Sequence, residues 1–582
     1  MDNKIKSAQP YQGQWIGLYS LIISLIAALI YFWRIQSFGD LEPRSDQAFL
    51  AWWVKGLVSS NHVLPHIEQG EQLIDALARD EKGILTQLLS PIYNSPTEIF
   101  KIIPIITYTF VAQIFGDSYS NQVAISIFTS VAIPFVLALY PIWGTPHKAT
   151  QTHMWIGFIA LILSSTSLYL HVFSGWGIHN AGILTLVIAG VISNNILSTL
   201  SKSPNLYKSL RPIIELFLIN ALAIYSFKTN LFLLPLATVF TILALPEIKW
   251  QRKFNLVFCY GSIVTILILP FIPLTLISAN KPDFAQDMTS PISLMLADLS
   301  SNLFDWPLII YNRTESWLVT AYKLYSLPGL IIGILGLYGL ARKGMRLPFY
   351  ILIAHYISWC FIPIFAGVSF RTYPYLIPFL GLGGAYFIVV SFRGVMLPNV
   401  NKKLLATIAS YLLIAHFVTQ IPIIRSKEHM ANVLPQFWST YFTGQGQLRP
   451  IIAEIEQILP TNAVLMTWGY GLQFLYRDLK TTGQDIELPA INALMLRQKA
   501  GLLLEHIKKR HLSLSVPANI YILVDHKIDH IDRQTLTSEI STLLGPKGFA
   551  IANDISLKSI SAWQLKSSWP KNITLYKVSL NK

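Results

Sequence analysis

Runs of uncharged, apolar residues recur along the first 424 positions of this 582-residue chain. Each is about 20 residues long, the length that an α-helix needs to cross the hydrocarbon core of a bilayer. The first run, WIGLYSLIISLIAALIYFW (15–33), is too long for the apolar core of a signal peptide and has no small-residue cleavage site. We therefore predict that it is retained as a span. The eleven predicted spans lie near residues 15–33, 122–143, 154–173, 175–197, 212–227, 231–246, 254–277, 325–341, 347–366, 373–392 and 404–424.

The composition excludes a soluble globular protein. Hydrophobic residues make up 53% of the chain and charged residues only 13%, whereas soluble domains are about 25% charged. The net charge of +14 does not indicate a nucleic-acid partner, because basic residues that flank membrane spans explain it. Both cysteines, Cys259 and Cys360, fall inside apolar runs, so we predict no structural disulfide.

The basic residues predict how the spans are oriented. The N-terminal segment and every second loop after it hold 15 Lys and Arg residues, whereas the short loops on the other side hold two, Lys228 and Arg371. Because cytoplasmic loops are enriched in Lys and Arg, we predict a multi-pass protein of the plasma or inner membrane with a cytoplasmic N-terminus. The 15 residues are Lys4, Lys6, Lys148, Lys202, Lys208, Arg211, Lys249, Arg252, Lys253, Arg342, Lys343, Arg346, Arg393, Lys402 and Lys403.

One apolar segment does not fit this alternation as a span. IFKIIPIITYTFVAQIFG (99–116) is apolar enough to cross a membrane but contains Lys101 and Pro104. If it crossed, every later basic cluster would face outward. We therefore predict an interfacial or re-entrant helix on the outer face. The outer loop 34–121, with its juxtamembrane helices, and the outer loop 278–324 complete a membrane domain over residues 1–424.

Residues 425–582 differ in composition and predict a second domain. AVLMTWGYGLQFLYRD, ANIYILVDHK and NITLYKVSL have the pattern of short β-strands, and MLRQKAGLLLEHIKKR (495–510) has that of an amphipathic helix. A segment of this size can form one independent unit. The predicted fold is a polytopic α-helical membrane protein of about eleven spans with a C-terminal α/β domain outside the cytoplasm.

Acidic residues gather directly after the first span, in SFGDLEPRSDQAFLAWW (37–53). Asp46 stands at the start of a predicted helix, where Ser45 or Asp46 would be a suitable N-cap. On spacing alone, capping is the more common role of such a residue. Glu42 and Arg44 are interpreted as a local ion pair or as surface charges.

The chain resembles the integral-membrane glycosyltransferases of the GT-C class, in particular the branch of protein O-mannosyltransferases and lipid A aminoarabinose transferases. The resemblance lies in the acidic helix start after the first span, in the segment 99–128, and in SFRTYPYLIPFLGLGGAYF (369–387), which is similar to a late R-x-Y-x-x-P signature. The chain departs from the family's Asp-Glu pair, which is Asp46-Gln47 here, and from its Lys-Pro-Pro, which is KIIP here.

The resemblance implies a sugar transfer from a polyprenyl-phosphate donor to an acceptor hydroxyl at the outer membrane face. A carboxylate would deprotonate the acceptor as a general base, and Asp46 matches that position, with Asp40 as its nearest rival. The donor phosphate calls for cationic ligands: Arg371 and Lys101 match, with Lys228 and then Arg313 less closely placed. An interfacial arginine at the end of a span is the alternative for Arg371.

The tight outer turn HVFSGWGIHNAG (171–182) supplies His179 and Trp176 as candidate residues of an acceptor or sugar pocket, together with Tyr375. Turn chemistry with an interfacial aromatic residue is the more common reading of such a segment. His355 and His416 lie within predicted spans, where single histidines usually satisfy hydrogen bonds of the helix bundle.

The predicted function is therefore a membrane glycosyltransferase, either hexosyl or pentosyl, whose acceptor is a lipid, a glycan or a protein. No resident cofactor or metal site is predicted, and assistance by a divalent metal stays open. The alternative is a polytopic lipid or glycan transporter or flippase, for which we would expect polar, interrupted helices at the midplane. The charges on outer loops and the outer domain favour the enzyme.

Overall fold

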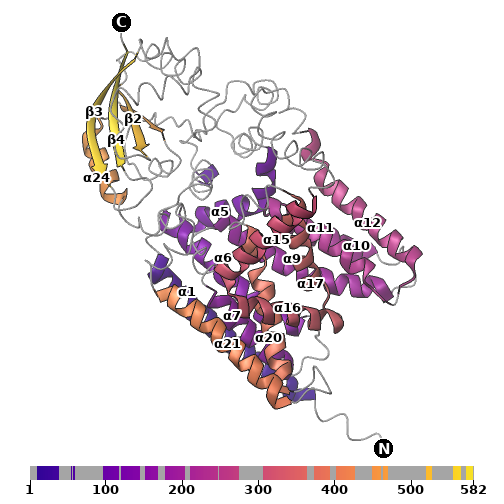
Figure 1. Ribbon diagram of the computed structural model, residues 1–582. Coiled ribbons are helices and arrows are strands. Elements are labelled where there is room, and N and C mark those ends of the chain that lie inside the picture. Colours follow the sequence, from indigo (N-terminus) through magenta and orange to yellow (C-terminus); the bar gives the residue numbers. More distant parts are fainter. Residues whose placement is uncertain are drawn as a thin grey trace, which may run out of the picture.

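The computed structural model describes residues 9–38, 54, 57–58, 96–116, 119–143, 151–167, 177–202, 210–246, 248–273, 306–362, 372–393, 402–425, 448–460, 463–468, 519–526, 555–564 and 572–580. Helices form one bundle, and strands form a sheet near one end of it (Figure 1). The bundle elements are α1 (Gln9–Phe38), η2 (Pro96–Lys101), α5 (Ile102–Phe115), α6 (Tyr119–Trp143), α7 (Gln151–Ser165), α9 (Gly177–Lys202), α10 (Leu210–Ile224), α11 (Lys228–Leu243), α12 (Trp250–Ile268), α15 (Trp306–Tyr325), α16 (Leu327–Arg342), α17 (Leu347–Phe361), η5 (Tyr373–Tyr375), α20 (Ile377–Arg393) and α21 (Lys402–Arg425).

A helix lies on each of the eleven predicted spans. Within the described residues, five helices are long and apolar enough to cross a membrane by themselves, and α15 with α16, bent by 106°, makes a sixth if the pair is one span. The remaining helices on apolar runs are shorter. The protein is thus a helical membrane protein with several spans, and the number eleven stays a prediction.

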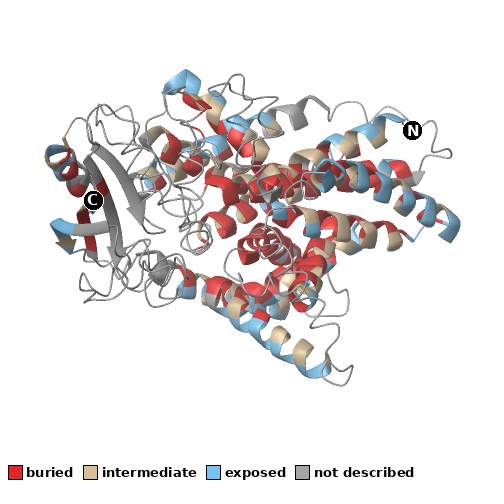
Figure 2. Cartoon of the chain, turned by 90° about the horizontal axis from the view of Figure 1, so that it is seen from above, coloured by how far each residue is buried: buried red, intermediate tan, exposed pale blue. Residues whose placement is uncertain are grey.

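The centre of the bundle is α20, whose span is 94% buried. It packs most closely against α16 and also against α7 and α21. Glycines permit the α16–α20 approach: a Cβ added at Gly336 would stand 1.6 Å from the Gly383 carbonyl oxygen, and one added at Gly383 would stand 2.2 Å from the Gly333 carbonyl oxygen. Small residues allow close helix packing in membranes, where van der Waals contact drives association. The burial pattern in Figure 2 follows: buried residues lie inside the bundle and exposed ones outside.

Asn230 connects three helices near one end of the bundle. Its side-chain nitrogen donates to the carbonyl oxygens of Gly182 in α9 and Ala223 in α10, both at 2.9 Å. The side chain itself is fully buried in α11. A polar group that satisfies neighbouring helices in this way stabilises their association.

We expect Asn230→Leu to lower the free energy of unfolding by about 1–2 kcal/mol, because interhelical hydrogen bonds in membranes contribute about 0.6–1.7 kcal/mol. The measurement is thermal unfolding of the purified protein in detergent. Thr407→Val is the matched control, since Thr407 is exposed and bonds only to the Lys403 carbonyl of its own helix. Equal losses in the two variants would contradict a role for Asn230 between helices.

The helix α5 agrees in length with the prediction that residues 99–116 do not span. Its 14 residues extend about 21 Å at 1.5 Å per residue, which is short of a hydrocarbon core of about 30 Å. Pro104 stands in the first turn, where a missing N–H costs no helical bond. Ile106, Phe110 and Ile114 form an exposed apolar stripe, and Figure 1 shows α5 across one end of the bundle.

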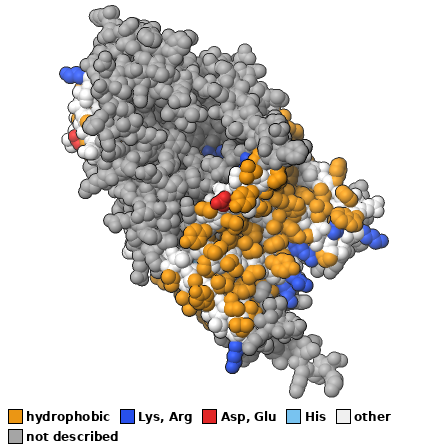
Figure 3. Space-filling view, in the orientation of Figure 1, with side chains coloured by type: hydrophobic (Ala, Val, Ile, Leu, Met, Phe, Trp, Pro, Cys, Tyr) orange, Lys and Arg blue, Asp and Glu red, His pale blue; other side chains and the backbone are white. Residues whose placement is uncertain are grey.

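Basic residues mark the opposite end. Arg252 donates to the Leu200 carbonyl at 2.8 Å, Lys253 donates to the Leu243 carbonyl at 2.6 Å, and the Arg346 amide donates to Asn194 at 3.0 Å. These contacts place loops that were predicted to be cytoplasmic at one common end, and Figure 3 shows Lys and Arg side chains along the lower right margin of an otherwise apolar face. Which end faces the cytoplasm stays a prediction.

The C-terminal strands form a four-stranded sheet of order β1-β2-β4-β3. β1 (Ala463–Trp468), β2 (Asn519–His526) and β4 (Asn572–Leu580) lie on the three segments predicted as strands, and β3 (Ile555–Gln564) was missed. β1 and β2 are parallel, and β4 is antiparallel to β2 and β3. The helix α24 (Leu448–Ile458) meets the sheet where Trp563 donates to Glu454 at 2.7 Å. The predicted helix 495–510 lies outside the described residues.

Candidate functional site

The segment η2–α5 packs against the turn between α10 and α11, at the end of the bundle away from the basic loops. The Ile103 amide donates to the Tyr225 carbonyl at 3.2 Å. The Phe100 ring stacks on Tyr225 with 6.1 Å between centroids and lies 5.3 Å from Phe271. Tyr225 in turn donates through its hydroxyl to the Leu267 carbonyl at 2.6 Å. The segment that carries Lys101 is therefore held on the ends of α10 and α12.

This contact brings two predicted phosphate ligands to adjoining segments. Lys101 follows Phe100 and is 7% exposed, and Lys228 is the third residue after Tyr225 and begins α11. The side chain of Lys228 is exposed, whereas that of Lys101 is buried. Two ammonium groups near one turn create a positive potential that favours an oxyanion.

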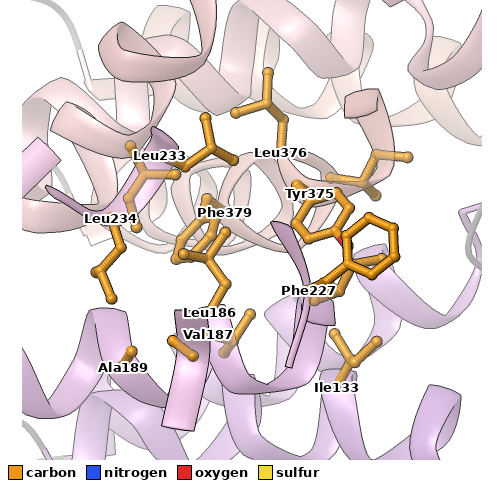
Figure 4. Packing of buried hydrophobic residues seen from close by; sticks show 14 of the residues in the cluster. Ile133, Leu186, Val187, Ala189, Phe227, Leu233, Leu234, Tyr375, Leu376 and Phe379 are labelled. Carbon is orange, nitrogen blue, oxygen red and sulfur yellow. The ribbon is translucent and has the colours of Figure 1, made fainter. Parts of the chain in front are cut away.

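Aromatic residues form a wall beside Lys228. The rings of His179 and Phe227 have centroids 4.5 Å apart, and Phe227 stacks on Tyr375 at 6.1 Å (Figure 4). A Cβ at Gly182 would stand 2.5 Å from the Tyr375 hydroxyl, so only glycine permits this approach. Two of the three predicted pocket residues, His179 and Tyr375, are thus brought together around Phe227. Both are buried, so they support the site from within.

His355 holds the segment that follows Arg371. Trp317 donates through its indole N–H to His355 Nδ1 at 3.2 Å, and His355 Nε2 lies 3.2 Å from the Thr372 carbonyl oxygen. A neutral ring with its proton on Nε2 satisfies both contacts, because Nδ1 then accepts and Nε2 donates. His355 is a positioning residue for the backbone next to Arg371, a role that the sequence analysis did not assign.

Two further cations belong to this end of the bundle. Arg313 in α15 donates to the Cys360 carbonyl at the end of α17. Arg34 in α1 is fully buried and donates to Ser130 at 2.8 Å. Arg34 was overlooked because it directly follows the first predicted span, where an arginine usually marks the membrane boundary. Its burial is the signal that only the structure supplies.

Four predicted site residues, Asp40, Asp46, Trp176 and Arg371, lie outside the described residues. Their roles stay predictions from the sequence. Within the described part of the chain, no group of three or more His, Cys, Asp or Glu side chains is arranged to hold a metal ion.

The fold and this end of the bundle define a helical membrane protein with a cationic, aromatic-supported surface and a neighbouring sheet. Solved structures of two proteins have a similar fold over nearly the whole chain. One is ArnT from Cupriavidus metallidurans in the apo state, a GT-C lipid A aminoarabinose transferase, at 10% identity over 97% of this chain and 98% of that chain, with a TM-score of 0.46. ArnT bound to undecaprenyl phosphate gives 11% identity over the same shares, with a TM-score of 0.45.

The other is the Archaeoglobus fulgidus oligosaccharyltransferase AglB tethered with an acceptor peptide, at 11% identity over 97% of this chain and 74% of that chain, with a TM-score of 0.48. These neighbours are of the class that the sequence resembles. At such identities the likeness concerns the fold and assigns no role to any residue. No protein-family model matches the sequence, and no curated protein matches it.

Proposed function

We propose that this protein is a membrane glycosyltransferase that moves a sugar from a polyprenyl-phosphate donor to an acceptor hydroxyl at the outer membrane face. The observation that carries the proposal is that Lys101 and Lys228 lie on adjoining segments, which the contact between Phe100 and Tyr225 holds together. It gathers positive charge at the end of the bundle away from the basic loops, in a chain whose motifs resemble those of GT-C transferases.

In this reaction the acceptor oxygen forms a bond to the anomeric carbon of the sugar, and the bond from that carbon to the phosphate oxygen breaks. The phosphate stays with the polyprenyl lipid, so its negative charge increases as the bond breaks. Lys101, Lys228 and Arg371 are proposed to bind this phosphate, because charge-assisted hydrogen bonds are the strong ones. Asp46 is proposed to take the proton of the acceptor hydroxyl as general base, with Asp40 as its rival.

His355 supports the proposed phosphate site indirectly. Its bond to the Thr372 carbonyl limits the movement of the residue next to Arg371. Binding groups that are held in place need less ordering when the donor arrives. The buried ring pair of Phe227 and Tyr375 similarly supports the backbone that leads into Lys228.

The activity is tested by offering the purified protein a panel of radiolabelled polyprenyl-phosphate sugars together with lipid, glycan and peptide acceptors, and measuring labelled product. We expect the double variant Lys101→Gln, Lys228→Gln to raise the donor KM by roughly 10²-fold or more, because each hydrogen bond to a charged group contributes about 1.5–3 kcal/mol. The effect on kcat is expected to be smaller.

Arg211→Gln is the matched control. Arg211 is an exposed cation at the other end of the bundle, paired with Glu215 at 2.8 Å, and its loss is expected to leave the donor KM unchanged. If the wild type transfers sugar and the double variant has the same donor KM, the two lysines do not bind the donor phosphate. Absence of transfer with every donor, together with movement of a labelled lipid across vesicles, would instead favour a flippase.

A further inference from the structure

Arg34 carries a charge in the interior of the bundle, with no counter-charge among the residues that the structure describes. Its side chain in α1 is 0% exposed. Nη1 donates to the Ser130 hydroxyl in α6 at 2.8 Å, and Nη2 donates to the Ser165 carbonyl in α7 over a long 3.5 Å. Within the described part of the chain, Nε has no hydrogen-bond partner. Among the described residues, no acidic side chain pairs with Arg34.

Such a guanidinium is costly to bury unless an anion joins it. An arginine cannot be neutralised by loss of a proton in proteins, and charged side chains within membrane segments are expensive and mostly functional. Because Nη1 bonds to Ser130, the guanidinium edge that carries Nε and Nη2 is the one available for an anion. Two parallel N–H groups on one edge match the two oxygens of a phosphate or carboxylate.

The contacts of Arg34 among the described residues are polar and uncharged, which suits an incoming anion. The hydroxyls of Ser165 and Ser167 at the end of α7 are buried and have no hydrogen-bond partner among the described residues. Buried polar groups are nearly always hydrogen-bonded, so such exceptions need an explanation. A phosphate offers acceptor oxygens to hydroxyls as well as to the guanidinium.

The position of α1 indicates that the anion comes from the membrane. Only 11% of the α1 span is buried, against 94% of the α20 span, so most of α1 faces lipid. α1 meets α6 through Tyr31 and Phe128, whose rings lie 6.3 Å apart, close to Arg34 along α1. A lipid can therefore approach Arg34 along the border between α1 and α6.

The contacts of α6 indicate the depth of Arg34 in the bundle. Ser130 is one helical turn from Ser126, whose hydroxyl lies 2.9 Å from that of Tyr108. A Cβ added at Gly177, the first residue of α9, would stand 1.6 Å from the same Tyr108 hydroxyl. Ser130, the partner of Arg34, thus lies about one turn of α6 below the level of Gly177, the first residue of α9.

We propose that Arg34 binds a phosphate group that enters between α1 and α6, bidentately through Nε and Nη2, at a second site separate from the Lys101–Lys228 site. The ligand class is a phosphate monoester on a membrane lipid or free phosphate. The site follows from the geometry of Arg34 and does not depend on the proposed transfer reaction.

The test counts polyprenyl monophosphate bound to the full chain in phosphatidylcholine nanodiscs, by native mass spectrometry. We expect two bound molecules per wild-type chain and one in Arg34→Gln. If Lys101 and Lys228 also bind a lipid phosphate, the double variant Lys101→Gln, Lys228→Gln retains the lipid molecule bound at Arg34 and loses the one bound at the lysines. The two proposals therefore fail separately. Ser24→Ala, on the exposed face of α1, is the control and is expected to bind like the wild type.

Two further experiments identify the source of the phosphate and distinguish loss of binding from misfolding. Inorganic phosphate is added as a competitor for the bound lipid. If it displaces one lipid molecule only at millimolar concentration, the site is assigned to lipid, and if it does so at micromolar concentration, the site is assigned to free phosphate. Polyprenol without phosphate should not bind. Arg34→Lys keeps the charge without the paired N–H groups and should weaken this site at least about tenfold. Unchanged binding to folded Arg34→Gln or Arg34→Lys would overturn the proposal.

Discussion

Asp46→Asn is expected to lower turnover by roughly 10²–10⁴-fold, the usual contribution of a general base, with little change in thermal stability. The amide keeps a side-chain oxygen that can still cap a helix, whereas it cannot accept a proton at neutral pH. Loss of a helix cap costs only about 0.5–2 kcal/mol. The measurement is initial rate with the active donor from the panel, together with thermal unfolding of the same preparation.

Glu42→Gln and Asp40→Asn separate this role from a general effect of charge in the same segment. We expect a mild effect for Glu42→Gln, since Glu42 is interpreted as an ion-pair or surface residue. If Asp40→Asn is inactive and Asp46→Asn is active, the general base is Asp40. Normal turnover in both variants would show that neither carboxylate carries out the proton transfer.

Gly336→Ala is expected to destabilise the membrane domain by about 3 kcal/mol or more, at the upper end of what overpacking costs. The added methyl group would stand 1.6 Å from the Gly383 carbonyl oxygen, which is backbone of α20 and cannot rotate away. Separation of α16 from α20 would disturb the most buried span of the protein. The measurement is the yield of monodisperse protein and its thermal unfolding temperature in detergent.

Gly261→Ala in α12 is the matched control. It is also a helix glycine, but nothing lies within 4 Å of a Cβ built there. Because alanine has the higher helix propensity by about 1 kcal/mol, this variant should be at least as stable as the wild type. If both alanine variants behave alike, the close approach of α16 and α20 is not a source of stability.

The sequence selects some residues of the candidate site because they interrupt a strong pattern, and their roles stay predictions. Lys101 and Lys228 are cations beside long apolar runs, and a charge in such a place is visible without knowledge of the fold. His179 and Tyr375 were chosen with less reason, from a turn and from a motif. The structure joins these two through Phe227, to which the sequence analysis had assigned no role.

His355 and Arg34 show why the rest could not be predicted. His355 looks like any single histidine within a span, and its role depends on Trp317 and Thr372, which come from other segments. Arg34 looks like a boundary arginine, and only its contacts with α6 and α7 show that it is buried. In both cases the function of the residue depends on contacts between segments far apart in the chain.

By itself the sequence predicted a helical membrane protein, helices on eleven apolar runs, and three of the strands that follow residue 424. It did not predict α15, which lies within the predicted outer loop 278–324, nor α24. These properties depend on local patterns: the length of apolar runs and the alternation of side chains along a strand. Only the tertiary structure decided that α16 and α20 meet through glycines, that Lys101 lies beside the α10–α11 turn, and that Arg34 is enclosed. Lipid and helix interior are both apolar, so hydropathy predicts where a span lies but does not predict its neighbours.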